Sequence, residues 1–312
     1  MSVLAAPPPP ADPVKLTKKA LTADHPTWCP GCGDFAVLAV FYRVLEKLNY
    51  PHEKIVTMAG IGCSSRFPYF VNTHGGHYIH GRSVPFSAGI SLSRDDLHVF
   101  VFGGDGDGFS IGGNHLDHVA RKNVRLTYVI MDNQVYGLTK KQTSPTSPQG
   151  FKTKTDPAGA IDQPVNPMRK LVNSGATFVA RSHATQVNHM TEMMLRAAQH
   201  DGFSVVEILS ECVEFFPGAF DAGNPRKGGA FTIIDEKKND GSADDATRHD
   251  PSNFTAAMAL ADEPWPGRFG VYYEIKRPTK NALEAGLIAK ARERTKAATD
   301  LALLQATFAK MR

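Results

Sequence analysis

The chain lacks long apolar runs, and this absence excludes two classes of protein. No run approaches the roughly 18 apolar residues that a membrane-spanning helix requires. The N-terminus also lacks the apolar core of a secretory signal peptide. We therefore expect a cytoplasmic protein that has no membrane partner.

The chain also lacks a dominant charge and has few cysteines. Its net charge is only +4 over 312 residues, with no basic arm or stripe, so nucleic acid is not an expected partner. Four cysteines in a reducing compartment favour metal or redox roles over structural disulfides. What the chain does have, at 42% hydrophobic residues, is enough apolar material for a sizeable core.

One stretch predicts a phosphate and metal site. The apolar run 98–102 predicts a strand buried on both faces, and it leads into four glycines within residues 103–108 that let backbone N–H groups approach an anion. The carboxylates of Asp105 and Asp107 would repel a diphosphate unless a divalent cation lay between them, which predicts Mg²⁺. After a predicted helix over 110–122, a second apolar run ends at Asn133, which offers another oxygen ligand.

The four cysteines predict a second site nearby. Cys29 and Cys32 form a CxxC motif before an amphipathic helix, Cys63 follows a strand-like run at 55–59, and Cys212 follows another at 204–209. A parallel sheet brings such strand ends together, so four thiolates can converge. The set suits structural zinc or a [4Fe–4S] cluster, and spacing alone does not choose between them; unligated buried cysteines are a third possibility.

These motifs resemble thiamine diphosphate enzymes and, among them, the β subunits of 2-oxoacid:ferredoxin oxidoreductases. The shared motifs cover most of residues 28–220 and lie at Trp28–Asp34, Gly60–Ser65, His80–Arg82, Gly104–Asp107, Leu116–Asn123 and Asp132–Pro148. The resemblance implies Mg²⁺ on Asp105, Asn133 and the carbonyl of Val135, and a [4Fe–4S] cluster on Cys29, Cys32, Cys63 and Cys212. Thiamine diphosphate chemistry on a 2-oxo acid yields an electron-rich carbon centre, whose electrons a cluster can accept and zinc cannot.

The resemblance also implies a set of site residues. The candidate catalytic residues are His80, Arg82 and Lys140, with an internal ion pair as the alternative for Arg82. Lys140 matches the family's substrate-side lysine, whereas Lys141 stands where similar relatives usually have glycine. The candidate cofactor-binding residues are Cys63, Ser64, Ser65, His80, Gly104, Asp105, Gly106, Asp107, Asn133, Val135, Gly137 and Leu138.

The predicted fold class is α/β, a doubly wound and mostly parallel sheet of the diphosphate-binding type with a C-terminal extension. We expect an N-terminal arm over residues 1–27, the cofactor-binding domain over 28–215, and an extension over 216–312 that covers a partner. Residues 281–311 have the composition of one long terminal helix.

The expected function is oxidative decarboxylation of a 2-oxo acid, with 2-oxoglutarate favoured, coenzyme A as co-substrate and ferredoxin as electron acceptor. A single diphosphate-binding unit leaves no room for a pyrimidine-binding domain, so we expect an α subunit to supply that domain and its glutamate in an (αβ)₂ assembly. The alternatives are a pyruvate-specific member of the family, a non-oxidative decarboxylase or carboligase, and a zinc-stabilised subunit without redox activity.

Overall fold

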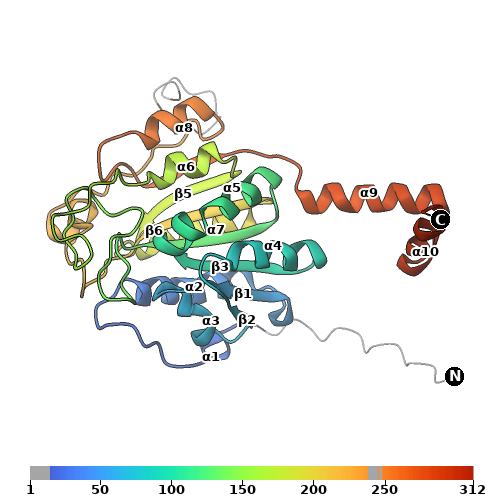
Figure 1. The fold of residues 1–312 in the computed structure, drawn as a ribbon, viewed down its shortest axis with the longest axis horizontal. Helices are drawn as coiled ribbons and strands as arrows, with labels where there is room; N and C mark the ends of the chain where they lie inside the picture. Colours follow the sequence, from blue (N-terminus) through green and yellow to red (C-terminus); the bar gives the residue numbers. More distant parts are fainter. Residues whose placement is uncertain (1–14, 238–244, 246–247, 312) are drawn as a thin grey trace.

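Strand order brings the ends of strands from distant parts of the chain together at one edge of the sheet. The computed structural model describes residues 15–237, 245 and 248–311. Its sheet has seven strands in the order β2-β1-β3-β4-β6-β5-β7 (Figure 1). They are β1 Ile55–Ala59, β2 His74–His77, β3 His98–Gly104, β4 Leu126–Asp132, β5 Phe178–His183, β6 Phe203–Leu209 and β7 Gly270–Glu274. All pair in parallel except β7, which is antiparallel to β5.

Helices cover both faces of this sheet, as a doubly wound α/β fold requires. One hydrophobic core contains residues of α2, α3 and α7, and the other contains residues of α4, α5, α6 and α8. The helices are α1 Lys18–Leu21, α2 Asp34–Leu48, α3 Phe67–Phe70, α4 Ser83–Ser93, α5 Gly113–Lys122, α6 Pro167–Asn173, α7 Val187–Gln199, α8 Phe254–Ala261, α9 Lys280–Thr295 and α10 Asp300–Lys310. The central strands β3 to β6 are buried on both faces, which explains the largely apolar sequences of β3 and β4.

Asn123 ties the C-terminal part of the chain to the sheet. It follows α5 with a left-handed φ of 51°, and its Nδ2 donates to the carbonyl of Arg277 over 2.8 Å. Its Oδ1 accepts hydrogen bonds from the Thr177 hydroxyl and the Phe203 amide, each over 2.8 Å. This buried amide therefore joins the end of α5, the start of β6 and the segment that leads into α9.

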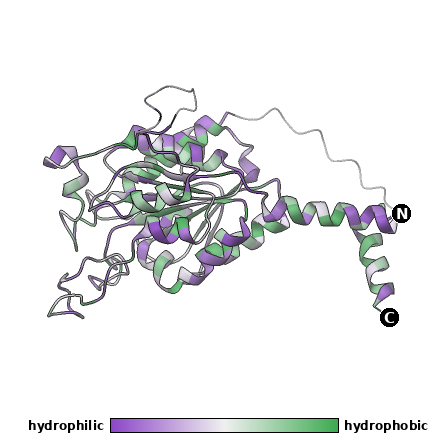
Figure 2. Cartoon of the chain, turned by 90° about the horizontal axis from the view of Figure 1, so that it is seen from above, coloured by the Kyte–Doolittle hydropathy of each residue, from purple (hydrophilic) through white to green (hydrophobic). Residues whose placement is uncertain are grey.

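The prediction of one continuous helix over 281–311 is wrong. Two helices, α9 and α10, project from the body instead (Figure 1). The break occurs because Lys296 turns left-handed at φ 53°, after which the Thr299 hydroxyl accepts from the Ala302 amide and begins α10. Both helices carry exposed apolar side chains, among them Leu287 and Phe308. Hydrophobic and hydrophilic residues alternate along the projecting arm in Figure 2.

Parts of the segments outside the predicted central domain pack on it. Leu16 and Leu21 belong to the core on the α2 side, and β7 extends the sheet beyond β5. The predicted domain limits at residues 27 and 215 stay predictions. The expectations for residues 1–14, and for part of the charged stretch 235–250, lie outside the described residues.

No helix in the described part of the chain has both the length and the hydropathy needed to cross a membrane.

Candidate active site

The site lies where four parallel strands end side by side. Ala59 of β1 is level with Phe102 of β3, and Gly104 of β3 is level with Met131 of β4. Asp132, the last residue of β4, is level with Leu209 of β6. The loops that follow these strands carry Cys63, Asp105, Asn133 and Cys212. The crevice at the carboxyl ends of such strands is where open α/β sheets bind their ligands.

Two buried carboxyl groups, Asp105 and Asp132, share one hydroxyl partner in this crevice. The Thr146 hydroxyl lies 2.7 Å from Asp105 Oδ2 and 2.8 Å from Asp132 Oδ1, and both aspartates are almost fully buried. Burial raises the pKa of Asp105. Burial and the nearby Asp105 and Glu207 carboxylates raise the pKa of Asp132 well above its usual range. Among the described residues neither group takes part in an ion pair, so the site suits a bound cation.

The turn after β4 is shaped by its own side chains. Asp132 Oδ1 accepts from the Gln134 amide over 2.9 Å, and Asn133 Oδ1 accepts from the Val135 amide over 3.1 Å. These short-range bonds let Gln134 adopt a left-handed φ of 56°. The turn places Asn133 and Val135 beside Asp105 in the same pocket.

That pocket gathers the predicted cofactor-binding residues. Every member of the predicted set except Ser65 lines it. Ser65 is fully buried elsewhere, and its hydroxyl has no hydrogen-bond partner in the part of the chain that the structure describes. The pocket has a volume of about 90 Å³, far below the roughly 300 Å³ or more of a typical small-molecule site. This pocket alone is therefore too small to enclose a typical small-molecule ligand.

The glycine-rich stretch after β3 is a helical turn rather than the open loop that its glycines suggest. Residues Gly106–Ile111 form a π-helix that runs into α5. A Cβ atom at Gly106 would lie 2.2 Å from the ring of Tyr136, so only glycine lets this turn pack against the loop after β4. The predicted helix over 110–122 is correct in type and begins at Gly113.

The structure brings the four cysteines into one neighbourhood with free thiols. Cys29 is exposed, whereas Cys32, Cys63 and Cys212 are half-buried. Burial raises the pKa of Cys63 to about 11, with the Asp34 carboxylate and the Cys212 and Cys29 thiols acting in the same direction. Burial also raises the pKa values of Cys32 and Cys212. Thiolates at this position therefore need a cationic centre to stabilise them.

Trp28 holds the cysteine loops together. Its indole Nε1 donates to the carbonyl of Cys63 over 2.6 Å. Its ring packs edge-on against Phe35 and Phe70, with centroid distances of 5.4 and 4.8 Å. A buried aromatic side chain therefore connects the CxxC loop before α2 to the loop after β1.

Gly137 lies beside both the pocket and two of the cysteines. It lines the pocket, and a Cβ atom at this position would lie 3.5 Å from Cys212 Sγ and 3.7 Å from Cys63 Sγ. Cys63 lines the pocket as well, so the two predicted sites share a boundary at Gly137 and Cys63.

Among the described residues, no group of three or more His, Cys, Asp or Glu side chains has an arrangement that could hold a metal ion. A [4Fe–4S] cluster requires a different arrangement of ligand atoms. Each of its four irons binds one thiolate, so the four cysteine sulfurs lie apart around the cluster.

Of the three candidate catalytic residues, only His80 lines the pocket. Arg82 does not; its guanidinium donates to the carbonyls of Gly81 and Ile111 over 3.2 and 3.3 Å, and it makes no ion pair among the described residues. Lys140 is exposed on the loop beyond Leu138, with a left-handed φ of 71°.

Some site residues escaped the sequence analysis. Tyr136 and Thr139 line the pocket, and Thr146 bridges the two buried aspartates. All three belong to the stretch after β4 whose motif was recognised. Only the folded loop shows which of its side chains turn inward.

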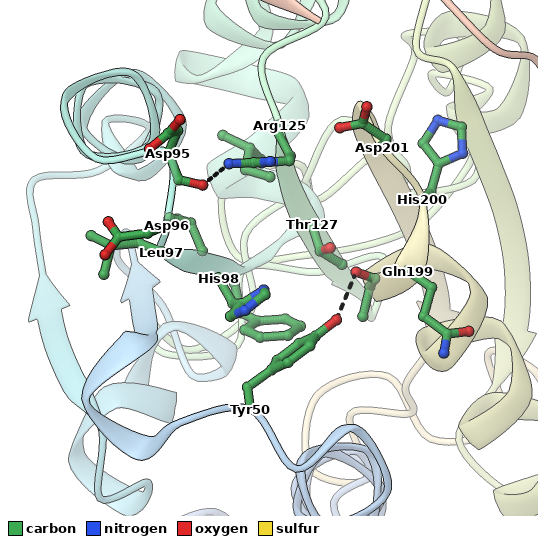
Figure 3. A pocket seen from close by; sticks show the side chains of 14 residues that line it. Tyr50, Asp95, Asp96, Leu97, His98, Arg125, Thr127, Gln199, His200 and Asp201 are labelled. Carbon is green, nitrogen blue, oxygen red and sulfur yellow. Dashed lines mark hydrogen bonds between the residues drawn. The ribbon is translucent and has the colours of Figure 1, made fainter. Parts of the chain in front are cut away.

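Two larger hollows contain none of the predicted site residues. One, of about 420 Å³, lies at the amino ends of the strands, where the Tyr50 ring stacks on His98 and its hydroxyl points to the carbonyl of Ala198 (Figure 3). The other, of about 500 Å³, lies beside Asp132 and is walled by Arg181 and Trp265.

Comparisons with known proteins agree with this geometry. Residues 59–208 match the family described as "Thiamine pyrophosphate enzyme, C-terminal TPP binding domain". A 2-oxoglutarate oxidoreductase subunit KorB from Mycobacterium tuberculosis is 48% identical over 205 residues, which are 65% of this chain and 55% of that protein. The 2-oxoglutarate synthase subunit KorB from Archaeoglobus fulgidus is 42% identical over 185 residues, which are 59% of this chain and 69% of that protein.

A solved structure extends the likeness to nearly the whole chain. The 2-oxoglutarate:ferredoxin oxidoreductase from Magnetococcus marinus, solved with 2-oxoglutarate, coenzyme A and succinyl-CoA bound, matches with a TM-score of 0.80 and 38% sequence identity. The match covers 93% of this chain and 95% of that one. By contrast, the chain spans little more than half of the M. tuberculosis relative. The chain belongs to the family of 2-oxoacid:ferredoxin oxidoreductase β subunits.

Proposed function

We propose that this chain is the β subunit of an enzyme that oxidatively decarboxylates a 2-oxo acid and passes the electrons to ferredoxin. The favoured reaction converts 2-oxoglutarate and coenzyme A to succinyl-CoA and CO₂. The observation that carries the proposal is the shared boundary at Gly137 between the pocket around Asp105 and the sulfurs of Cys63 and Cys212. A non-oxidative decarboxylase has no use for a redox centre at that boundary.

Thiamine diphosphate with Mg²⁺ is the cofactor that the pocket fits. Asp105, Asn133 and the carbonyl of Val135 would hold the ion, and the uncompensated buried carboxyl groups favour a divalent cation there. When bound, thiamine diphosphate supplies the carbon centre at which a 2-oxo acid loses CO₂. The chain's own residues bind and orient it, and Tyr136 closes one side of the pocket.

A [4Fe–4S] cluster on Cys29, Cys32, Cys63 and Cys212 is the redox centre of the proposal. Its positive charge would offset the burial that now raises the pKa values of Cys32, Cys63 and Cys212. Cys29, the exposed member, gives the cluster a side near solvent from which ferredoxin would take electrons. Four free thiols also suit a cytoplasmic location, where cysteines stay reduced.

The site is completed by a second polypeptide in this proposal. The pocket is too small to enclose the cofactor, and exposed apolar residues lie at or beside it. Ile61 and Leu138 line it, Ile79 directly precedes the lining residue His80, and the Ile111 carbonyl accepts a hydrogen bond from Arg82. Ile79 is 75% exposed, which is unusual for an isoleucine next to a binding site. An α subunit that covers these residues would bring the pyrimidine-binding domain and its glutamate, in an (αβ)₂ assembly.

The proposed substrates rest on the similarity to the M. marinus enzyme, whose structure was solved with 2-oxoglutarate and coenzyme A bound. Lys140 would contact the carboxylate of the 2-oxo acid. Lys140 and Lys141 both have left-handed backbones, at φ 71° and 76°, and such strain in non-glycine residues concentrates at functional sites. The Lys141 ammonium lies 5.3 Å from the centroid of the Phe151 ring. Lys140 is therefore the better candidate of the two lysines for contact with a substrate.

The proposal is tested by co-expressing the chain with its α subunit and assaying reduction of a viologen dye under anaerobic conditions. We expect turnover that requires both a 2-oxo acid and coenzyme A, with kcat/KM at least about 10-fold higher for 2-oxoglutarate than for pyruvate. The reconstituted chain alone should be inactive. Equal use of the two acids would contradict the substrate, turnover by the lone chain would contradict the shared site, and aldehyde release without coenzyme A would indicate the non-oxidative alternative.

Changing any one of the four cysteines to serine should remove the cluster, because an iron would lose its thiolate. We expect the iron and acid-labile sulfide of the assembled protein to fall, together with its visible absorption and dye reduction. Ser87→Ala, which alters another small buried side chain, should leave the iron content unchanged. Zinc without sulfide in the wild-type protein would support the zinc-stabilised alternative instead.

Replacing Lys140 with alanine should raise KM for the 2-oxo acid by about 10-fold or more, because a charge-assisted hydrogen bond contributes about 1.5 kcal/mol or more. Cofactor and iron content should not change. Lys141→Ala is the matched control, since its backbone is equally left-handed and its ammonium packs on Phe151. A larger rise in KM for Lys141→Ala than for Lys140→Ala would reverse the assignment.

A further inference from the structure

Asp107 has a different set of contacts from Asp105, although both belong to the same glycine-rich motif. Its Oδ1 lies 2.6 Å from Nδ1 of His80 and accepts from the backbone amides of Gly81 and Ile61 over 2.7 and 2.9 Å. Only 2% of the residue is exposed. One carboxylate oxygen therefore collects three donors from two separate loops, and it faces a histidine ring.

These contacts determine how the His80 ring carries its proton. An ionised carboxylate can only accept hydrogen bonds, and the two amides on the same oxygen are both donors. Nδ1 of His80 must therefore hold the hydrogen that it shares with Asp107. In the neutral ring, Nε2 then has a free lone pair, and the described residues provide no hydrogen-bond partner for it. His80 itself lines the pocket.

We propose that Asp107 is a positioning residue that holds His80 as the Nδ1–H tautomer, with Nε2 available to accept a hydrogen bond from the group bound in the pocket. The proposal rests on the proposed function. In it, the bound substrate or cofactor donates a hydrogen bond to Nε2, and the contact between Asp107 and Nδ1 fixes the ring orientation in which it does so.

A purely structural role for Asp107 must be separated from this one. The same oxygen fixes the loops at Ile61 and Gly81, so complete loss of the side chain would disturb the pocket wall whatever His80 does. Asp107→Asn is the informative change. An asparagine keeps the size and one oxygen for the three donors, and its amide can donate to Ser83 Oγ, which lies 3.5 Å from Oδ2. It removes only the negative charge opposite the ring.

The first test compares Asp107→Asn, His80→Gln and the double variant in the assembled enzyme. We expect His80→Gln to lower kcat by about 100-fold and Asp107→Asn by about 10-fold, with little change in KM. The double variant should match His80→Gln within about 3-fold, because Asp107 acts through the ring that is already gone. Asp156→Asn is the control, because Asp156 collects threonine hydroxyls in a loop outside the pocket.

The second test needs no activity. Diethyl pyrocarbonate reacts with an unprotonated imidazole nitrogen, and mass spectrometry measures its rate at His80 in the cofactor-free assembly. We expect Asp107→Asn to slow this reaction, since a ring without the carboxylate is a poorer nucleophile, and thiamine diphosphate to protect the wild type. A merely structural Asp107 predicts the opposite, a faster reaction in a loosened pocket.

Two results would overturn the inference: losses in kcat that multiply in the double variant, or modification of His80 that is as fast or faster in Asp107→Asn. A wild-type assembly without 2-oxo acid oxidation would instead overturn the proposed function. In that case the modification rates would still show whether Asp107 changes the reactivity of the His80 ring.

Discussion

The burial of two carboxyl groups that take part in no ion pair is the constraint at the centre of the structure. Asp105 and Asp132 share the Thr146 hydroxyl at the ends of neighbouring strands, and neither takes part in an ion pair among the described residues. Burial raises the pKa of both groups, and the proposed Mg²⁺ would offset the free-energy cost of burying them in ionised form. The turn at Asn133 and the rest of the pocket lining lie around Asp105.

The same strand order places the cysteines against this pocket. Cys63 follows β1 and Cys212 follows β6, two strands that β3 and β4 separate, yet both sulfurs lie near Gly137 at the pocket. The proposed carbon chemistry and the proposed electron removal would thus be neighbours without sharing ligands. The exposed isoleucines beside the pocket are where the proposed second subunit would cover the site.

Sequence patterns predicted the parts of this arrangement that rest on local chemistry. The apolar runs located β1, β3, β4 and β6 within a few residues, and glycine, aspartate and cysteine at strand ends located the pocket. They did not predict the contact between Asp107 and His80, because it joins residues 27 positions apart across a π-helical turn. The sequence patterns also predicted one helix in place of α9 and α10. The composition favours a helix throughout, so it does not reveal the break made by one left-handed lysine and one capping threonine.

The central claim is that the buried Asp105 carboxylate exists to hold a divalent cation on a diphosphate. Calorimetric titration of thiamine diphosphate into the assembled protein, with and without Mg²⁺, tests it most directly. The account predicts tight binding to the wild type only when Mg²⁺ is present, and a loss of affinity of at least about 100-fold in Asp105→Asn. Equal affinity with and without Mg²⁺, or an unchanged affinity in Asp105→Asn, would contradict it.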